Sequence, residues 1–195
     1  MTKNILLILG HPSKNSFNKV LLDAYQKGAE RAGATCKTIY ISDLHFDVNL
    51  ADGYKSGKAG ELEEDLVAAQ KLFQWANHVV FAFPNWWGAM PAITKGFIDR
   101  LFLPGFAFKN HKGKNFPEQL LKGKSIRVLV TMDTPKLWFY LVHRASLYLI
   151  LKKVVFGYVG FKPVNFSTFG FMRKSTGTLR AAWLRKVEAL GTQIN

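Results

Sequence analysis

Short apolar segments alternate with longer helical patterns along the chain, and this alternation limits the fold more than any other feature of the sequence. The segments with strand character cover residues 5–9, 35–41, 79–83, 126–131 and 164–169. Three of them are continuously apolar, which is typical of strands buried on both faces of a parallel sheet. Helical patterns cover residues 17–32, 61–75, 93–101, 137–156 and 178–190. This order predicts a doubly wound α/β domain.

The length and composition predict one domain over residues 1–195, because a chain that is 48% hydrophobic and 21% charged can bury one sizeable core. The apolar run at residues 5–9 is too short for the core of a signal peptide, and the single cysteine, Cys36, cannot form an internal disulfide. Both features predict a cytoplasmic protein. Residues 137–161 are the most membrane-like stretch, but they carry several basic side chains, so we expect a buried or interface helix there.

The net charge of +14 is concentrated in the second part of the chain. Residues 1–108 contain 11 Lys and Arg against 10 Asp and Glu, whereas residues 109–195 contain 16 against 3. A positive field of this kind favours phosphorylated cofactors, acidic protein surfaces, anionic lipid or nucleic acid. Nucleic acid is the least favoured of these partners, because the aromatic residues fall mostly in strand and helix patterns.

The loop after the first strand is the first candidate for a ligand site, since doubly wound sheets bind ligands beyond the carboxyl ends of their strands. It spans residues 10–18 and has neither the spaced glycines of a dinucleotide fingerprint nor a Walker lysine. Ser13, Asn15, Ser16 and Asn18 are crowded where a helix begins. The free N–H groups and positive dipole of a helix start suit a phosphate. Alternatively, Ser16 only caps the helix.

The loop after the third strand places two adjacent tryptophans at the same edge of the predicted sheet. Pro84 ends the strand, and Pro91 suits the first turn of the next helix. Asn85, Trp86 and Trp87 lie between the two prolines. Flat rings at this edge can pack along a planar heterocycle, with loop amides facing its polar edge. The alternative for a tryptophan pair is a packing or dimer-interface role.

Three stretches of the sequence carry a resemblance to a known family. They are GHP…SFN after the first strand, PNWWGAMPAITKGFIDRLFLPGFAF after the third, and VGFKP before the last. Together they resemble the flavodoxin-like NAD(P)H:quinone oxidoreductases, which include mammalian quinone reductases and bacterial ancillary oxidoreductases of potassium-efflux systems. The resemblance covers nearly the whole chain. It implies a flavodoxin-like three-layer fold with a five-stranded parallel sheet and helices on both faces.

The resemblance also implies a cofactor and a reaction. The cofactor would be FMN or FAD, NADH or NADPH would donate the hydride, and a quinone or a similar small molecule would accept two electrons. A homodimer is implied, in which the second subunit completes each site. We expect no nucleophile–base pair and no metal site, because the cofactor supplies the chemistry and the sequence has no Cys/His cluster at metal-ligand spacing.

The site residues that the resemblance implies fall into three groups. The residues expected to hold the phosphate end of the flavin are His11, Ser16, Phe17 and Asn18. Those expected to line its ring system are Pro84, Asn85, Trp86 and Trp87. The residues expected at the reacting groups are Trp87, Phe108, which occupies the position of a substrate-pocket aromatic, and His143, which matches an active-site histidine if a small gap is allowed.

The loop after the fourth strand departs from the family pattern. Many relatives have a Thr-Thr-Gly-Gly type of loop, whereas this chain has TMDTP at residues 131–135. The missing glycines change how closely the backbone can approach the flavin. Thr131 and Asp133 remain the expected cofactor contacts of this loop. An alternative function is a flavin-bearing regulatory or ancillary subunit whose basic second part binds an acidic protein partner or a membrane surface.

Overall fold

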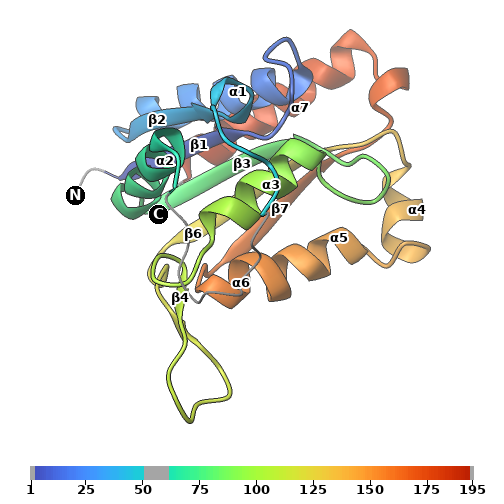
Figure 1. Ribbon diagram of the computed structural model, residues 1–195. Coiled ribbons are helices and arrows are strands. Elements are labelled where there is room, and N and C mark those ends of the chain that lie inside the picture. Colours follow the sequence, from blue (N-terminus) through green and yellow to red (C-terminus); the bar gives the residue numbers. More distant parts are fainter. Residues whose placement is uncertain (1–2, 51–61, 194–195) are drawn as a thin grey trace.

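A five-stranded parallel sheet forms the centre of the protein in a computed structural model that describes residues 3–50 and 62–193 (Figure 1). The strand order is β2-β1-β3-β6-β7, and every neighbouring pair is parallel. The strands are β1 (Asn4–Leu9), β2 (Thr35–Tyr40), β3 (His78–Pro84), β6 (Ser125–Thr131) and β7 (Val164–Phe169). The predicted α/β fold and its five strands are confirmed.

The interior strand β1 is apolar at nearly every position because both of its faces are covered. Ile5, Leu7 and Leu9 belong to one buried cluster, and Leu6 and Ile8 belong to the other. Successive side chains of a strand point to opposite faces of the sheet. A strand covered on both faces therefore has no position at which a polar residue would be solvated.

Helices cover both faces of this sheet (Figure 1). One face carries α1 (Phe17–Arg31) and α7 (Gly177–Thr192), whose apolar residues belong to the cluster that contains Ile5. The helices on the other face are α2 (Glu64–Trp75), α3 (Ala92–Leu101), α4 (Lys136–Leu141), α5 (Ser146–Leu149) and α6 (Phe156–Val159). Residue 61, where the second helix was predicted to begin, lies outside the described residues.

Shorter elements complete the chain. Two antiparallel strands, β4 (Phe108–Lys109) and β5 (Glu118–Gln119), pair beside the main sheet. Single turns of 3-10 helix occur at η1 (Ile41–Asp43) and η3 (Met172–Lys174), and a π-helix, η2 (Ile150–Val155), joins α5 to α6. Among the described residues, no helix combines the length and the apolar character needed to cross a bilayer.

Two glycines let α1 and α7 pack with their backbones in contact. A Cβ added to Gly28 would lie 2.0 Å from the carbonyl oxygen of Glu188, and one added to Gly191 would lie 2.3 Å from that of Tyr25. Real Cβ atoms do not come this close to backbone, so neither position tolerates a larger residue without moving a helix. This contact fixes α1, whose first turn borders the candidate site.

The single helix predicted over residues 137–156 is wrong, because the structure divides this stretch into α4, α5 and the π-helix η2. The break falls at Arg144 and Ala145, which have positive φ angles of 50° and 47°. In one straight helix, Phe139 and Tyr148 would point about 180° apart, since each residue turns by about 100°. With the break, both are buried and their rings pack 5.0 Å apart. Burial of both aromatics favours the interrupted form.

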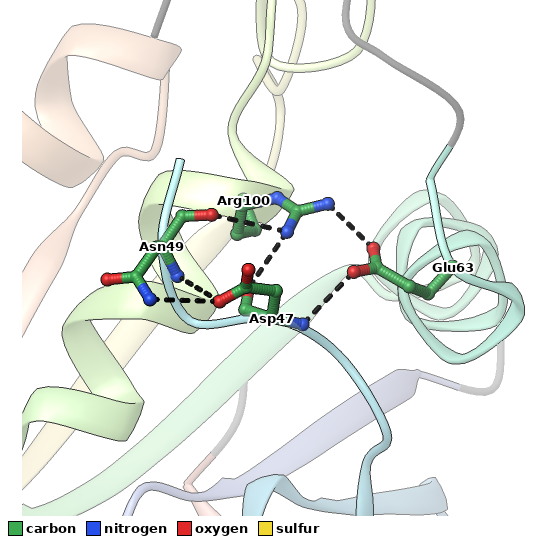
Figure 2. A network of polar contacts seen from close by, with 4 residues as sticks. All are labelled: Asp47, Asn49, Glu63 and Arg100. Atoms are coloured by element: carbon green, nitrogen blue, oxygen red, sulfur yellow. Dashed lines mark hydrogen bonds and ion pairs between the residues drawn. The ribbon is translucent and has the colours of Figure 1, made fainter. Parts of the chain in front are cut away.

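A polar network fixes the segment before α2 to the end of α3 (Figure 2). Arg100 Nη2 donates to Glu63 Oε2 over 2.7 Å and Nη1 donates to the carbonyl oxygen of Asp47 over 2.8 Å. Burial by itself raises the pKa of Glu63, but the N–H groups of Asp47 and Glu63 and the Arg100 guanidinium outweigh it and lower that pKa. A Cβ on Gly96 would lie 2.7 Å from the carbonyl oxygen of Val48, so glycine permits this close approach.

Candidate functional site

A groove of about 530 Å³ lies where β3 and β6 end. Its walls are residues 84–87, 131–134 and 172–173. The chain passes from β1 outward to β2 and then returns to β3 on the other side of β1, so the strand order reverses between β1 and β3. Ligands of open α/β sheets bind at this kind of position. The loops that follow β1, β3 and β6 thus surround the predicted site.

The loop after β1 is held between the starts of α1 and α3. Gly10 donates its N–H to the carbonyl oxygen of Ala82, and Thr94 Oγ1 donates to the carbonyl oxygen of Gly10 over 2.7 Å. Ser16 is the N-cap of α1, and its Oγ accepts a hydrogen bond from the Lys19 N–H over 3.4 Å. Ser16 therefore caps α1, and other first-turn N–H groups of α1 are left available to an anion.

His11 joins this loop to the tryptophan loop. Its ring lies 5.6 Å from the ring of Trp86 at an interplanar angle of 71°. Burial is the main cause that lowers the pKa of His11, and the Ser13 N–H donates to its ring. Because Nδ1 accepts that bond over 2.9 Å, the neutral ring carries its proton on Nε2. His11 is thus a neutral donor at the edge of the site at pH 7.

Two buried polar atoms at the site have no hydrogen-bond partner among the described residues. They are Asn18 Nδ2 and Asn85 Oδ1. The Asn18 side chain is only 3% exposed, and its Oδ1 accepts a hydrogen bond from Thr131 Oγ1 over 3.0 Å. Buried polar groups in proteins are nearly always paired, because an unpaired one costs free energy. A free donor and a free acceptor beside one groove therefore fit a polar ligand there.

Trp87 stands at the tip of a tight turn beside the groove. The N–H groups of Trp86 and Ala89 donate to each other's carbonyl oxygens over 2.8 and 3.0 Å. The two residues between them, Trp87 and Gly88, have φ angles of 53° and 79°, a pattern typical of type I′ turns. A positive φ is strained for a bulky residue, and the Trp87 side chain is fully exposed at 105%. An exposed aromatic held in a strained turn is more typical of a binding site than of a core.

The loop after β6 adds a carboxylate that is already paired. Asp133 Oδ1 accepts from the Arg173 N–H over 2.8 Å, and its Oδ2 lies 3.0 Å from Arg173 Nε. This pair joins the loop after β6 to η3. Met172 and Arg173 line the groove but were not among the predicted site residues. They follow the last strand, and the only signal in the sequence was the basic pair at residues 173–174 after that strand.

Most of the predicted cofactor residues come together at this edge. The groove is lined by Pro84, Asn85, Trp86, Trp87, Thr131 and Asp133. His11 and Asn18 border it through Trp86 and Thr131, and Ser16 caps the helix that begins there. Phe17 differs, because its ring packs against Trp183 of α7 at 6.1 Å between centroids. Only its backbone remains for a ligand at the start of α1.

Phe108 and His143 lie outside the lining of this groove. Phe108 is half-buried in β4 and its ring contacts Tyr158 at 5.5 Å between centroids. β4 follows the end of α3, at the opposite end of that helix from the tryptophan loop (Figure 1). His143 is exposed after α4, with its ring 6.4 Å from that of Phe139. One subunit alone does not bring either residue to the groove.

Within residues 3–50 and 62–193, no group of three or more His, Cys, Asp or Glu side chains is arranged to hold a metal ion. The other three histidines each have a partner. His78 is buried between Tyr25 and Ser125, His45 lies near Asp65, and His111 contacts Glu118. The groove therefore has aromatic faces, amides, hydroxyls and one neutral imidazole as its chemical groups, which is a binding surface for an organic cofactor.

Comparison with known proteins places this arrangement in a family. The model of the family described as having a flavodoxin-like fold matches residues 3–190. The chain is 28% identical over 171 residues to the uncharacterized NAD(P)H oxidoreductase of Haemophilus influenzae, covering 86% of this chain and 83% of that protein. It is also 30% identical over 130 residues to the ribosyldihydronicotinamide dehydrogenase [quinone] of Pongo abelii, covering 54% of each chain.

Among solved structures, Smu.1420 from Streptococcus mutans is similar over nearly the whole chain. Its TM-score is 0.82 and its identity is 30%, covering 98% of this chain and all of the other. The match to the Pongo abelii enzyme is shorter, and the chain spans about half of that relative's length.

Proposed function

This chain belongs to the flavodoxin-like fold family, and on that premise we propose that it is an oxidoreductase that passes two electrons from NAD(P)H through a bound flavin to a quinone or a similar small acceptor. The names of the Haemophilus and Pongo relatives support an NAD(P)H- and quinone-linked activity. Because relatives bear the names of enzymes, catalysis is favoured over the ancillary-subunit role that the sequence left open.

One observation carries the proposal. The groove at the strand reversal has a buried free acceptor, Asn85 Oδ1, in its wall, and a buried free donor, Asn18 Nδ2, lies beside it on the residue that bonds with Thr131. The donor lies in the first turn of α1, where N–H groups and the helix dipole suit a phosphate. The acceptor lies next to two tryptophan rings that suit a planar heterocycle. The two ends of the site thus match the two ends of a flavin mononucleotide unit, which both FMN and FAD contain.

We assign the flavin contacts on this basis. His11, Ser16, Phe17 and Asn18 would hold the phosphate end, with Phe17 acting through its backbone. Asn85, Trp86 and Trp87 would line the ring system, and Thr131 and Asp133 would border its polar edge. A bound flavin would accept a hydride from NAD(P)H and pass two electrons to the acceptor. The protein's own residues would bind the flavin, orient it and shield it from water. None of the groove residues has to change its protonation state.

His11 is the titratable group best placed to donate a hydrogen bond to a bound anion. Its lowered pKa keeps the ring neutral at pH 7, and Nε2–H is its donor. A neutral imidazole can stabilise negative charge by donating a hydrogen bond without adding a full positive charge to the site. Asp133 differs from His11, because both of its oxygens already contact Arg173.

We also propose that the protein acts as a homodimer. Leu149, Ile150, Val154 and Tyr158 leave an exposed apolar stripe along α5, η2 and α6. Contiguous apolar surfaces of this kind usually mark an interface, and a two-fold axis would place the stripe against its copy. The contact of Phe108 with Tyr158 puts Phe108 beside this stripe. A second subunit would then bring that ring toward the neighbouring site.

The absorption spectrum of the purified protein tests the proposed function. We expect a yellow preparation that NADH or NADPH bleaches in the absence of oxygen and that a quinone recolours. Mass analysis of the released cofactor distinguishes FMN from FAD. A colourless protein that takes up neither flavin would refute the proposal, and a flavin-loaded protein that no nicotinamide reduces would refute its enzymatic part.

A further inference from the structure

Next to the groove, α4 presents apolar side chains to solvent. Leu137, Trp138 and Leu141 are 71%, 55% and 69% exposed, and Val142 and Phe171 are also exposed. Leu137 and Leu141 are four residues apart, so they lie on one face of the helix. We call these five residues the α4 patch. A monomeric protein rarely exposes several large apolar side chains together without a partner.

Contacts on the inner side of α4 hold the α4 patch in a fixed position. Phe139 is buried in the core and packs against Tyr148, and the Tyr140 hydroxyl bonds with Thr168 Oγ1 over 3.1 Å. A Cβ added to Gly170 would lie 3.0 Å from the Thr134 carbonyl oxygen and 3.1 Å from Lys136 Cγ. The turn that carries Phe171 therefore lies directly against the start of α4.

Basic residues surround the patch. Lys136 begins α4, Arg144 follows it, and Arg173 and Lys174 follow Phe171. Burial and the neighbouring charge of Lys186 lower the pKa of Lys136, so cations are crowded here. Asp133 is the one acidic residue within residues 131–144 and 170–175, and it is paired with Arg173. The patch thus combines exposed Leu and Trp side chains with an unbalanced positive charge.

This combination selects one occupant. A two-fold contact through this patch would bring two positively charged surfaces together, with only the already paired Asp133 of each copy to offset them, which is unfavourable. An acidic protein would balance the positive charge of the patch. However, the exposed Leu and Trp side chains of the six-residue helix α4 form no pocket for such a protein. An anionic bilayer satisfies both features, because Trp and Leu enter the boundary between headgroups and acyl chains while Lys and Arg attract acidic headgroups.

We propose that the α4 patch docks this protein on the surface of anionic phospholipid bilayers. The contact is peripheral and reversible, since only a short turn of apolar side chains enters the lipid. Residues 133–134 and 172–173 line the groove and adjoin α4 and Phe171 in sequence, so the groove opens next to the docked surface. A lipid-dissolved acceptor would then be close to its site; this last consequence alone rests on the proposed function.

Vesicle co-sedimentation tests the docking without any measurement of turnover. We expect the purified protein to bind phosphatidylcholine vesicles that contain phosphatidylserine, and to bind them much less at high salt or when the vesicles are pure phosphatidylcholine. Leu137→Ser with Leu141→Ser should lower the partition coefficient by at least about tenfold. Arg144→Asn with Lys174→Ser should lower it on anionic vesicles only. The matched control is Val67→Ser with Phe116→Ser, exposed apolar residues elsewhere, which should bind as wild type.

Other outcomes would overturn the proposal. It fails if the wild-type protein does not bind anionic vesicles, or if the Leu137→Ser, Leu141→Ser variant binds them equally well. A change from dimer to monomer in that variant would assign the patch to a second copy. Retention on immobilised polyglutamate that falls with these substitutions, without vesicle binding, would assign it to an acidic protein.

Lipid quenching, measured at a lipid concentration that binds both proteins fully, gives a second readout. In vesicles with brominated acyl chains, the fluorescence difference between the wild type and Trp138→Phe reports Trp138 alone. We expect this difference to be quenched on binding, because Trp138 enters the acyl boundary. A bound protein in which it is not quenched would show that another surface faces the lipid.

Discussion

The side chain of Asn18 accepts a hydrogen bond from the Thr131 hydroxyl over 3.0 Å, and this bond ties the first turn of α1 to the end of β6. Asn18 is buried in the first turn of α1, and the N-cap of that helix is Ser16. The bond uses the amide oxygen and leaves Nδ2 for a ligand. Two loops that are far apart in the sequence thus meet at the proposed phosphate end of the site.

Asn18→Asp should weaken both the flavin complex and the apoprotein. The new carboxylate still accepts from Thr131, but it replaces the free donor with a negative charge beside the flavin phosphate. We expect the flavin dissociation constant to rise at least about tenfold, or about 1.4 kcal/mol. A buried carboxylate without a counter-ion should also lower the free energy of unfolding of the apoprotein by about 1–3 kcal/mol. Fluorescence titration and urea unfolding measure the two effects.

Ser16→Asp is the matched comparison for that substitution. Aspartate is as good an N-cap as serine, so the apoprotein should keep its stability. The flavin dissociation constant should still rise, because the negative charge lies at the same helix start. Unchanged affinity in both variants would place the phosphate elsewhere.

Trp87→Asn should separate backbone strain from ligand binding. Asparagine tolerates a positive φ, so the free energy of unfolding should stay the same or rise by up to about 1 kcal/mol. Loss of the ring should weaken flavin binding by roughly three- to tenfold. Phe171→Asn is the control, because Phe171 is also an exposed aromatic with a positive φ, of 56°, but does not line the groove. Equal flavin affinities in the two variants would argue against ring contact by Trp87.

The buried His78 should make the protein less stable in mild acid. Burial, with help from Arg127 and Lys3, lowers the pKa of His78 to about 4. The unfolded chain, with an ordinary value near 6.5, then binds the proton more tightly than the folded one. The stability that His78 contributes is therefore present above pH 6.5 and is lost as the pH falls toward 4, by about 2 kcal/mol at pH 5.

Urea unfolding of the wild type and of His78→Gln at pH 7.5 and pH 5 isolates this effect. Glutamine does not titrate, so the variant should lose about 2 kcal/mol less than the wild type between the two pH values. Parallel pH dependence in both proteins would show that His78 does not carry the acid sensitivity.

Gly28→Ala should be strongly destabilising even though alanine favours helices. The added methyl group would lie 2.0 Å from a backbone oxygen of α7, which cannot move aside independently. We expect a loss of at least about 2 kcal/mol in the free energy of unfolding. Gly177→Ala, at the start of α7, meets nothing within 4 Å and should change that free energy by less than about 0.5 kcal/mol.

Ile150→Glu should dissociate the proposed homodimer. It places a charge in the middle of the exposed stripe on α5, η2 and α6, and desolvation of that charge would oppose association. Sedimentation velocity at micromolar concentration should show a dimer for the wild type and a monomer for the variant. Val67→Glu, at an exposed position of α2, should remain dimeric. A wild-type protein that sediments as a monomer would contradict the proposal directly.

The sequence by itself determined the sheet and the loops of the candidate site. Strands such as β1 and β3 are apolar at almost every position because both of their faces are covered, and this local pattern is visible without any structure. Helices that alternate with such strands leave few topologies, so the loops after β1, β3 and β6 could be placed at one edge. The aromatic and amide residues of those loops followed from their positions along the chain.

Only the tertiary structure decided which of those residues meet and where their free atoms lie. The bond between Asn18 and Thr131 joins residues 113 positions apart, and no local pattern indicates it. The break at Arg144 and Ala145 depends on burying Phe139 together with Tyr148, a gain that exists only when both segments pack on the same face of the sheet. Met172 and Arg173 reach the groove because Arg173 bonds with Asp133 across two loops. Contacts of this kind are set by packing between distant segments, and the sequence pattern of each segment carries no information about its partner.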